Sequence, residues 1–282
     1  MQDIHFISGL PRAGSTLLSA LLRQNPRFEA AMSSPVGGIF NACLAAMGPG
    51  NEFSLFLDEA RKREILMGIF RGYYGEHGVG GERTVFDTNR MWTSRLPAVL
   101  RLFPEAKVIC CVRDPAWVFD SMERLIRRNA LDVSRVFNSD AERATVYSRA
   151  EALMQRSRLI GYALAALKEA YYSDEAPAML LVDYNLLAAR PLETLRLIYR
   201  FIDAPWFEHD VNDVRYASDD FDRQLMVRGM HRVEGRVELR ERRTILPPDL
   251  FAQFSELAFW TRDHNTRAHL VVPRSAAVTR DA

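Results

Sequence analysis

A short segment near the N-terminus combines glycine, arginine and hydroxyl residues in the way that phosphate-binding loops do. It reads GLPRAGST over residues 9–16 and follows the apolar run Ile4–Ser8. The glycines allow successive backbone N–H groups to point at one anion, and a helix that begins there adds the positive end of its dipole. The sequence therefore predicts an anion-binding loop in which Arg12 is the only charged side chain.

The loop departs at one position from the nucleotide-binding pattern G-x-x-x-x-G-K-[ST]. Ser15 stands where that pattern has its lysine. An NTPase uses the lysine on the β- and γ-phosphates, and it binds Mg²⁺ through the hydroxyl that follows. With Arg12 as its only cation, the loop fits a shorter anion, bound without a metal ion, better than a triphosphate. A plain glycine turn with a solvated arginine is the simpler alternative.

An arginine and a serine follow the apolar run Lys107–Val112. Arg113 comes directly after this run, and Ser121 lies eight residues further on. The carboxyl ends of parallel strands are where open α/β sheets bind ligands, and a guanidinium fork with a nearby hydroxyl suits a phosphate. Arg113 and Asp114 could instead form a surface ion pair. Two anion sites on one sheet predict a nucleotide that is phosphorylated at both ends.

Strand-like and helix-like patterns alternate along the chain. Apolar runs typical of strands buried on both faces cover Ile4–Ser8, Thr84–Asp87, Lys107–Val112 and Met179–Asp183. Helical periodicity covers residues 16–24, 115–129, 141–172 and 191–202. This alternation predicts a single α/β domain of the P-loop type, with a central parallel sheet flanked by helices. We expect the domain to span residues 1–272 and to be followed by a flexible tail over 273–282.

Composition argues against several classes of protein. The 282 residues are 48% hydrophobic, enough to bury a full core, and the net charge of +1 provides no global field for nucleic acid. No apolar run is long enough to span a bilayer, and no secretory signal is evident, so a cytoplasmic protein is expected. The three cysteines and six histidines show no metal-ligand spacing, and no metal site is predicted.

Together these segments resemble the sulfotransferases that use 3′-phosphoadenosine 5′-phosphosulfate (PAPS). GLPRAGST is similar to the 5′-phosphosulfate loop of that family. VICCVRDPAWVFDSM is similar to its 3′-phosphate segment, in which a serine follows an arginine by eight residues. Residues 180–205 and the HRVEG segment at 231–235 resemble later elements of the family. The style is nearer to the bacterial and tyrosylprotein branch than to the steroid and phenol group.

The resemblance implies binding roles for a set of residues spread over the chain. Those expected to hold the 5′-phosphosulfate are Pro11, Arg12, Ala13, Gly14, Ser15 and Thr16. Those expected to hold the 3′-phosphate are Arg113 and Ser121. Tyr184 would approach the adenine, with a role as a packed aromatic side chain as the alternative. His231 and Arg232 would contact the nucleotide from a late loop.

The catalytic base of the family cannot be carried over to this sequence. Where the phenol and steroid enzymes have a histidine, this chain reads DTNR over residues 87–90. Where tyrosylprotein enzymes have a glutamate, Glu29 is only nearby. Asp87 is therefore the local candidate for the base, and a structural carboxylate is the alternative. Arg12 is the candidate for stabilising the charge that develops on the leaving phosphate.

The resemblance implies an enzyme, a sulfotransferase that moves a sulfuryl group from PAPS to a hydroxyl or amine acceptor. The transfer would be in line and metal-free, with adenosine 3′,5′-bisphosphate (PAP) as product. The acceptor would be a small molecule or a peptide, and aromatic residues between positions 32 and 92 are expected to line its pocket. A homodimer is compatible with the sequence. A P-loop kinase or NTPase with a degenerate loop and a non-catalytic nucleotide-binding protein are the alternatives.

Overall fold

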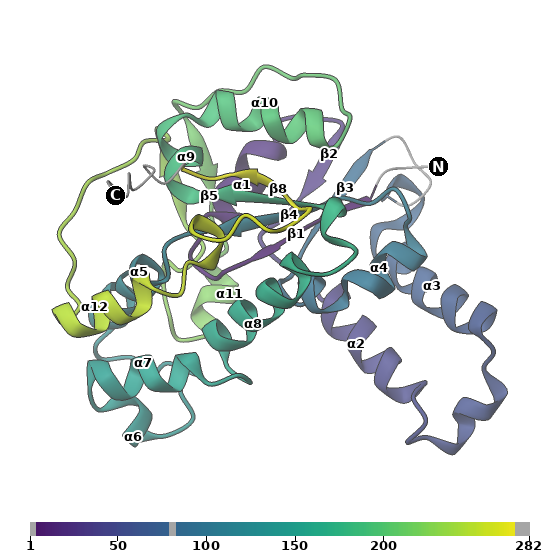
Figure 1. The fold of residues 1–282 in the computed structure, drawn as a ribbon, viewed down its shortest axis with the longest axis horizontal. Coiled ribbons are helices and arrows are strands. Elements are labelled where there is room, and N and C mark those ends of the chain that lie inside the picture. The colour runs from purple at the N-terminus through teal and green to yellow at the C-terminus, as the bar shows by residue number, and fades with distance from the viewer. Residues whose placement is uncertain (1–3, 79–82, 274–282) are drawn as a thin grey trace, which may run out of the picture.

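A six-stranded parallel sheet forms the centre of the molecule (Figure 1). The computed structural model describes residues 4–78 and 83–273, and its main sheet has the strand order β2-β3-β1-β4-β5-β8. The strands are β1 (Ile4–Gly9), β2 (Phe28–Ala30), β3 (Thr84–Thr88), β4 (Val108–Val112), β5 (Met179–Asp183) and β8 (His269–Val271). The predicted α/β fold is confirmed, and the four predicted strands agree with β1, β3, β4 and β5 to within one residue at each end.

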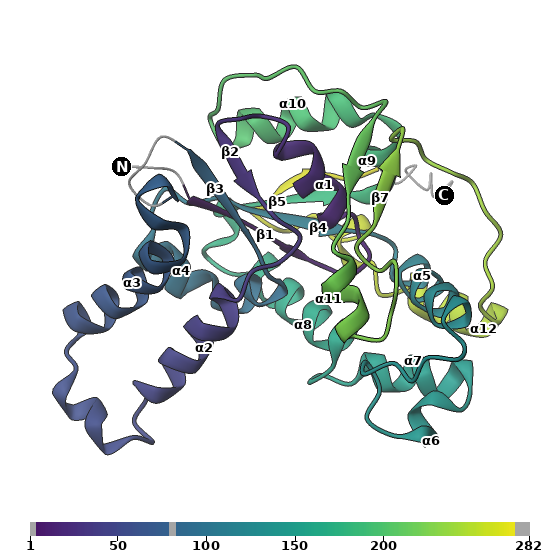
Figure 2. The same ribbon diagram turned by 180° about the vertical axis from the view of Figure 1, so that it is seen from behind.

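Helices cover both faces of this sheet, as Figures 1 and 2 show from opposite sides. On one side lie α1 (Ser15–Leu22), α9 (Tyr184–Ala189) and α10 (Pro191–Phe201), and on the other α4 (Leu96–Leu102) and α8 (Leu159–Tyr171). The other helices are α2 (Val36–Ala46), α3 (Glu59–Gly78), α5 (Pro115–Arg128), α6 (Asp140–Arg143), α7 (Val146–Met154), α11 (Asp219–Gln224) and α12 (Pro248–Ser255). A two-stranded antiparallel ribbon joins β6 (Val214–Tyr216) to β7 (Val233–Gly235).

The single helix predicted over 141–172 is three separate helices. The chain turns between α7 and α8, and a Cβ atom at Gly161 would lie 2.1 Å from the carbonyl oxygen of Met154. Because Gly161 has no side chain, the end of α7 can pack directly against the first turns of α8. Thr145 caps the start of α7 in a reciprocal capping box with Ser148. The apolar periodicity continues across these breaks, so it could not reveal them.

The sheet order brings the ends of three strands together. β1 pairs with β3 on one side and with β4 on the other, so the segments after Gly9, Thr88 and Val112 leave the same edge of the sheet. The approach at Gly9 is close, since its φ is 99° and a Cβ atom there would lie 2.2 Å from the carbonyl oxygen of Cys111. Glycine is therefore required where the predicted anion loop begins.

Two further expectations concern the pair of adjacent cysteines and the C-terminal tail. Cys110 and Cys111 are fully buried in β4, as predicted for strand interior. The tail predicted over 273–282 lies outside the described residues, except for Pro273. Within residues 4–78 and 83–273, no helix is long and apolar enough to cross a membrane.

Asp87 lies near the carboxyl end of β3, but its side chain is completely buried. Its carboxylate accepts hydrogen bonds from Trp92 Nε1 at 2.7 Å, Tyr74 Oη at 2.6 Å and Ser34 Oγ at 2.5 Å. Burial raises the pKa of Asp87, and these three hydrogen bonds lower it. A carboxylate enclosed by three donors ties β3 to α3, to the loop that carries Ser34 and to the short 3₁₀ helix that carries Trp92. These contacts favour the structural alternative for Asp87, and its role as base stays a prediction.

Replacing Asp87 by asparagine should therefore destabilise the fold. The amide NH₂ group would face at least one of the three donors, which would then be buried without an acceptor. We expect Asp87→Asn to lower the free energy of unfolding by about 2–4 kcal/mol, measured by urea denaturation. Asp58→Asn is the matched control, because exposed Asp58 accepts one backbone N–H group, from Arg61 at 2.7 Å. Equal stabilities of the two variants would contradict the structural role of Asp87.

Candidate functional site

Two neighbouring cavities lie at the edge of the sheet where β1, β3 and β4 end. The first has a volume of about 560 Å³ and the second about 310 Å³. The first lies between the loop after β1, the N-terminal turns of α5 and α9, and the chain from residue 230 to residue 242. The second lies between the ends of β1 and β3, α8 and the end of α11. Four residues line both cavities: Ser15, Arg90, Met230 and His231.

The loop after β1 forms one wall of the first cavity. Arg12 and Gly14 have φ angles of 58° and 97°, in the left-handed region, which turns the chain sharply before α1. Gly14 is the N-cap residue of α1, and no side chain caps the first N–H groups of this helix. A Cβ atom at Gly14 would lie 2.9 Å from Tyr184 Cδ2. The loop thus has the exposed helix start that anion binding requires.

The side chain of Arg12 joins three segments of the chain. Its Nε donates to Ser121 Oγ at 3.2 Å, and its Nη1 donates to the carbonyl oxygen of Met230. Burial lowers the pKa of Arg12, with the neighbouring Arg90 and Arg242 acting in the same direction. This contact brings the loop cation and the predicted 3′-phosphate serine into one site.

Arg113 lines the first cavity next to the loop after β1. Its guanidinium lies over the ring of Tyr184, 4.2 Å from the ring centroid, and its Nη1 lies 3.5 Å from the carbonyl oxygen of Arg12. The Nε of Arg113 is buried and has no hydrogen-bond partner among the described residues. Burial lowers the pKa of Arg113 to about 10, so the group stays charged at neutral pH. A buried cation with a free donor is suited to bind an anion.

Most of the residues predicted for nucleotide binding come together around this cavity. Those that line it are Arg12, Gly14, Ser15, Thr16, Arg113, Ser121, Tyr184, His231 and Arg232. Pro11 and Ala13 are buried beneath the loop and do not line the cavity. Tyr184 lines the cavity and also packs against the Arg113 guanidinium. Its position is therefore compatible both with the predicted approach to the adenine and with the alternative role as a packed aromatic side chain.

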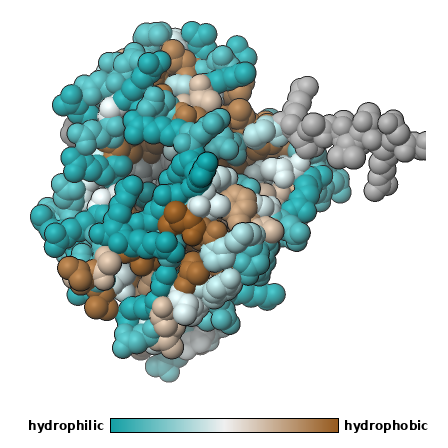
Figure 3. All heavy atoms as spheres, turned by 90° about the vertical axis from the view of Figure 1, so that its left-hand side faces the viewer, coloured by the Kyte–Doolittle hydropathy of each residue, from teal (hydrophilic) through white to brown (hydrophobic). Residues whose placement is uncertain are grey.

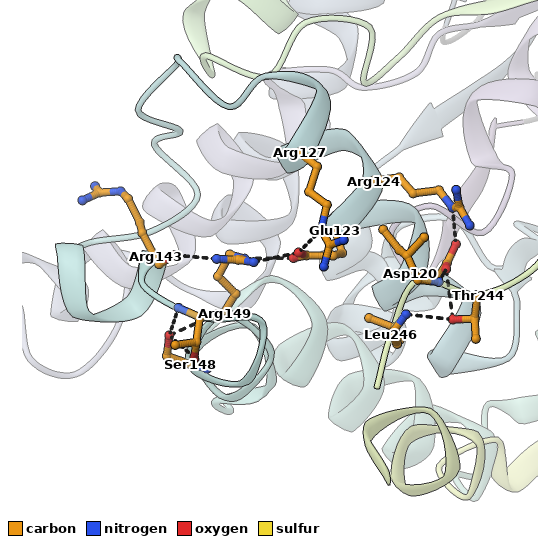
Figure 4. Close-up of polar contacts among 11 residues, drawn as sticks. Asp120, Glu123, Arg124, Arg127, Arg143, Ser148, Arg149, Thr244 and Leu246 are labelled. Atoms are coloured by element: carbon orange, nitrogen blue, oxygen red, sulfur yellow. Dashed lines mark hydrogen bonds and ion pairs between the residues drawn. The ribbon is translucent and has the colours of Figure 1, made fainter. Parts of the chain in front are cut away.

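Helix α5, which carries Ser121, is fixed on two sides by buried carboxylates (Figure 4). On one side, Glu123 accepts from Arg149 at 2.7 and 2.8 Å and from Arg127 at 2.8 Å. On the other side, Asp120 binds the chain that follows β7. Because both carboxylates lie within two residues of Ser121, they hold its hydroxyl in a defined position.

Residues 236–247, here called the strap, close the first cavity from outside. Asp120 holds the strap through Arg242 at 3.0 Å, Thr244 Oγ1 at 3.1 Å and the N–H of Ile245 at 2.8 Å. The strap crosses a face of the molecule that is mostly hydrophilic and carries several hydrophobic patches (Figure 3). It adds several charged side chains to the cavity wall.

Several cations in this site were not predicted from the sequence. Eight arginines line the first cavity: Arg12, Arg90, Arg113, Arg128, Arg232, Arg236, Arg240 and Arg242. The arginines on the strap lie in a stretch where positive and negative residues alternate, a pattern that is typical of a solvent-exposed surface. Arg90 follows β3 outside any motif, and burial lowers its pKa to about 10. Its guanidinium makes no hydrogen bond within residues 4–78 and 83–273, and it borders both cavities.

The second cavity has a largely apolar wall with polar residues at the boundary it shares with the first. Its apolar lining comes from Ile7, Leu10, Met32, Val136, Leu159, Phe221, Leu225 and Met230. None of the residues that line it is a carboxylate. None of the aromatic residues between positions 32 and 92 that were expected to line the acceptor pocket lines this cavity: Phe40 and Trp92 pack in the core, whereas Phe53 and Phe56 are exposed.

Comparison with known proteins identifies the family. The family model described as "Sulfotransferase family" matches residues 5–208. The sulfotransferase domain of the olefin synthase of Synechococcus PCC 7002 has 17% identity and a TM-score of 0.51, over 91% of this chain and 95% of that domain. Mouse sulfotransferase SULT7A1, solved with PAP, has 17% identity and a TM-score of 0.52, over 94% of this chain and 86% of the mouse chain. No curated protein matches the sequence. The chain belongs to the sulfotransferase family.

Proposed function

We propose that this sulfotransferase uses PAPS as donor and transfers its sulfuryl group to a hydroxyl or amine of a compact acceptor. The observation that carries the proposal is the meeting of two anion sites in one cavity. The loop after β1 and the pair Arg113 and Ser121 line the same 560 Å³ space, and Arg12 bonds directly to Ser121. The complex of the mouse enzyme with PAP supports a nucleotide of this kind.

The residues present fit a nucleotide that is phosphorylated at both ends. At one end, the uncapped start of α1 offers the backbone N–H groups of Ser15 and Thr16 to a 5′-phosphosulfate. At the other, the unpartnered Nε of Arg113 and the hydroxyl of Ser121 offer donors to a 3′-phosphate. The ring of Tyr184 and the strap enclose the space beside these groups.

Catalysis would depend on fixed positive charge at the boundary between the cavities. Arg12 and the N–H groups at the start of α1 would stabilise the charge that develops on the leaving phosphate oxygen. Arg90, which borders both cavities, would stabilise the oxygens of the sulfuryl group as it moves. An acceptor held in the second cavity would approach from the side opposite the leaving group, as an in-line transfer requires.

The arrangement of carboxylates favours this function over a degenerate kinase or NTPase. Asp183 ends β5, but its carboxylate caps α9 by accepting from the N–H groups of Asn185 at 2.8 Å and Leu186 at 3.3 Å. Asp87 is enclosed by three donors. The carboxylates that line the first cavity are Glu234, Glu238 and Glu241, all on β7 and the strap. The strand-end carboxylates that usually position Mg²⁺ are thus engaged elsewhere.

The second cavity favours a small acceptor over a peptide. Its volume of about 310 Å³ and its mostly apolar wall suit a compact molecule with one reactive hydroxyl or amine. Arg90 and Arg135 line it without a carboxylate, so a neutral or anionic acceptor fits better than a cationic one. A cytoplasmic location and a homodimer stay predictions.

Ligand binding tests the proposed donor against the kinase or NTPase alternative. We expect PAP to bind at least about tenfold more tightly than ATP with Mg²⁺ in isothermal titration calorimetry, because the cavity contains two anion sites and the strand-end carboxylates Asp87 and Asp183 are engaged in other contacts. Purified enzyme should also convert PAPS to PAP in the presence of a panel of phenols and alcohols. Tighter binding of MgATP than of PAP would contradict the proposal.

Replacing Arg113 tests which phosphate it binds. Arg113→Ala should weaken the binding of PAP by about 2–5 kcal/mol, because a buried charge-assisted contact is lost. It should weaken the binding of AMP far less. Arg190→Ala provides a matched control, since exposed Arg190 makes only a 3.6 Å ion pair with Glu193. If Arg113→Ala weakened PAP and AMP equally, the assignment of Arg113 to the 3′-phosphate would be wrong.

A further inference from the structure

The proposed reaction needs a group that takes a proton from the acceptor, and one histidine is placed to do so. We infer that His231 is the general base of this enzyme and that Asp222 positions it. The inference rests on the proposed function, because it concerns the acceptor side of the same site. It assigns the proton transfer to a segment that is distant in the sequence from Asp87 and Glu29, although His231 shares the second cavity with Thr88 and Ser15.

His231 lies on the boundary between the two cavities and lines both. The residues that line the second cavity include no carboxylate, and its two arginines are cations. Glu29 and Asp87 line neither cavity. Of the residues that border the acceptor space, His231 is therefore the one that can accept a proton near neutral pH.

Asp222 holds His231 through two hydrogen bonds to one carboxylate. Asp222 Oδ2 accepts the backbone N–H of His231 at 2.9 Å, and Oδ1 lies 2.6 Å from its Nδ1. Asp222 is 1% exposed and His231 is 8% exposed, so neither is free to swing into solvent. The ring of Phe221 meets the imidazole edge to face, with 5.5 Å between the ring centroids. The contact fixes the direction of the ring as well as its position.

This arrangement selects one tautomer of the imidazole. A carboxylate accepts the hydrogen bond, so Nδ1 carries the proton and Nε2 keeps its lone pair. The Nε2 atom makes no hydrogen bond to any residue of the described ranges 4–78 and 83–273. A neutral imidazole with a free Nε2 is the form that a general base requires.

Burial is the main cause that lowers the pKa of His231, which favours the neutral imidazole. Burial lowers its pKa below 6.5, Asp222 on α11 raises it, and the nearby Arg12 and Arg90 lower it. The imidazole is therefore unprotonated above pH 6.5 and available to accept a proton. Once protonated, it is stabilised by the adjacent Asp222 carboxylate.

The step balances without any further reactant. A lone pair of the acceptor oxygen forms the new O–S bond, while the bond from sulfur to the 5′-phosphate oxygen breaks. The electron pair of that bond stays on the phosphate oxygen of PAP. The acceptor proton passes to Nε2 of His231 and later to water. No atom is oxidised or reduced.

Two phenols that differ in acidity distinguish this role from a structural one. With phenol as acceptor at about pH 7.5, a proton must be removed, and His231→Ala should lower kcat by about 10²- to 10⁴-fold. With 4-nitrophenol at about pH 8.5, the acceptor is already ionised, and the loss should be less than about tenfold. His209→Gln is the control, because His209 is buried against Tyr199 and lines neither cavity.

The pH profile of kcat/KM and the variant Asp222→Asn provide a second test of the inference. With phenol, kcat/KM should rise through a pKa below 6.5 and level off above it, and His231→Ala should abolish this rise. In Asp222→Asn, the amide oxygen would keep the backbone N–H and its NH₂ would face Nδ1. The proton would then move to Nε2, and kcat should fall about 10²- to 10⁴-fold with PAP affinity retained.

Nuclear magnetic resonance of ¹⁵N-labelled histidine in the PAP complex needs no acceptor. His231 should show the neutral tautomer with Nδ1 protonated at pH 7.5, and Asp222→Asn should reverse the tautomer. Equal losses with the two phenols, or a wild-type His231 that is charged or protonated at Nε2, would overturn the inference. Failure of the wild type to bind PAP would contradict the proposed function instead.

Discussion

The site depends on the side chain of Arg12, which joins the loop after β1 by hydrogen bonds to two distant segments of the chain. From a backbone turn with a φ of 58°, its guanidinium reaches Ser121 on α5 and the carbonyl oxygen of Met230 after α11. These contacts place the loop beside Ser121 and close to the boundary with the second cavity. In the proposed function, they hold the two ends of a doubly phosphorylated nucleotide and the point of transfer in one site.

The parallel sheet brings these segments of the site together, and buried charged side chains hold them in place. Because β1 lies between β3 and β4, the anion loop is flanked by Arg90 and Arg113, whose burial lowers their pKa values to about 10 while leaving them charged. Asp120 joins α5 to the strap from the opposite side. Cations thus surround the first cavity from the sheet and the strap, whereas the second cavity is largely apolar. In the proposed function, this difference separates a site for the charged donor from a site for the acceptor.

Features encoded in short stretches of sequence could be predicted, and features that depend on distant contacts could not. The strand and loop before α1, and the spacing of Arg113 and Ser121, are local patterns and agree with the structure. The helix predicted over 141–172 is divided because Gly161 packs against Met154, a tertiary contact. Asp87 stands where a base was expected, but donors from three other segments enclose it. Arg90 and the strap belong to no sequence motif. The pairing of β1 with β3 brings Arg90 to the site, and the contacts of Asp120 bring the strap there.

A crystal structure of the enzyme with PAP would locate both phosphates independently of activity. We expect the 5′-phosphate at the N–H groups that begin α1, beside Arg12, and the 3′-phosphate within hydrogen-bond distance of the Arg113 guanidinium and Ser121 Oγ. We also expect the second cavity to stay open next to the 5′-phosphate. A nucleotide whose 3′-phosphate lies away from Arg113, or one that fills the second cavity, would show that the two anion sites do not serve one donor.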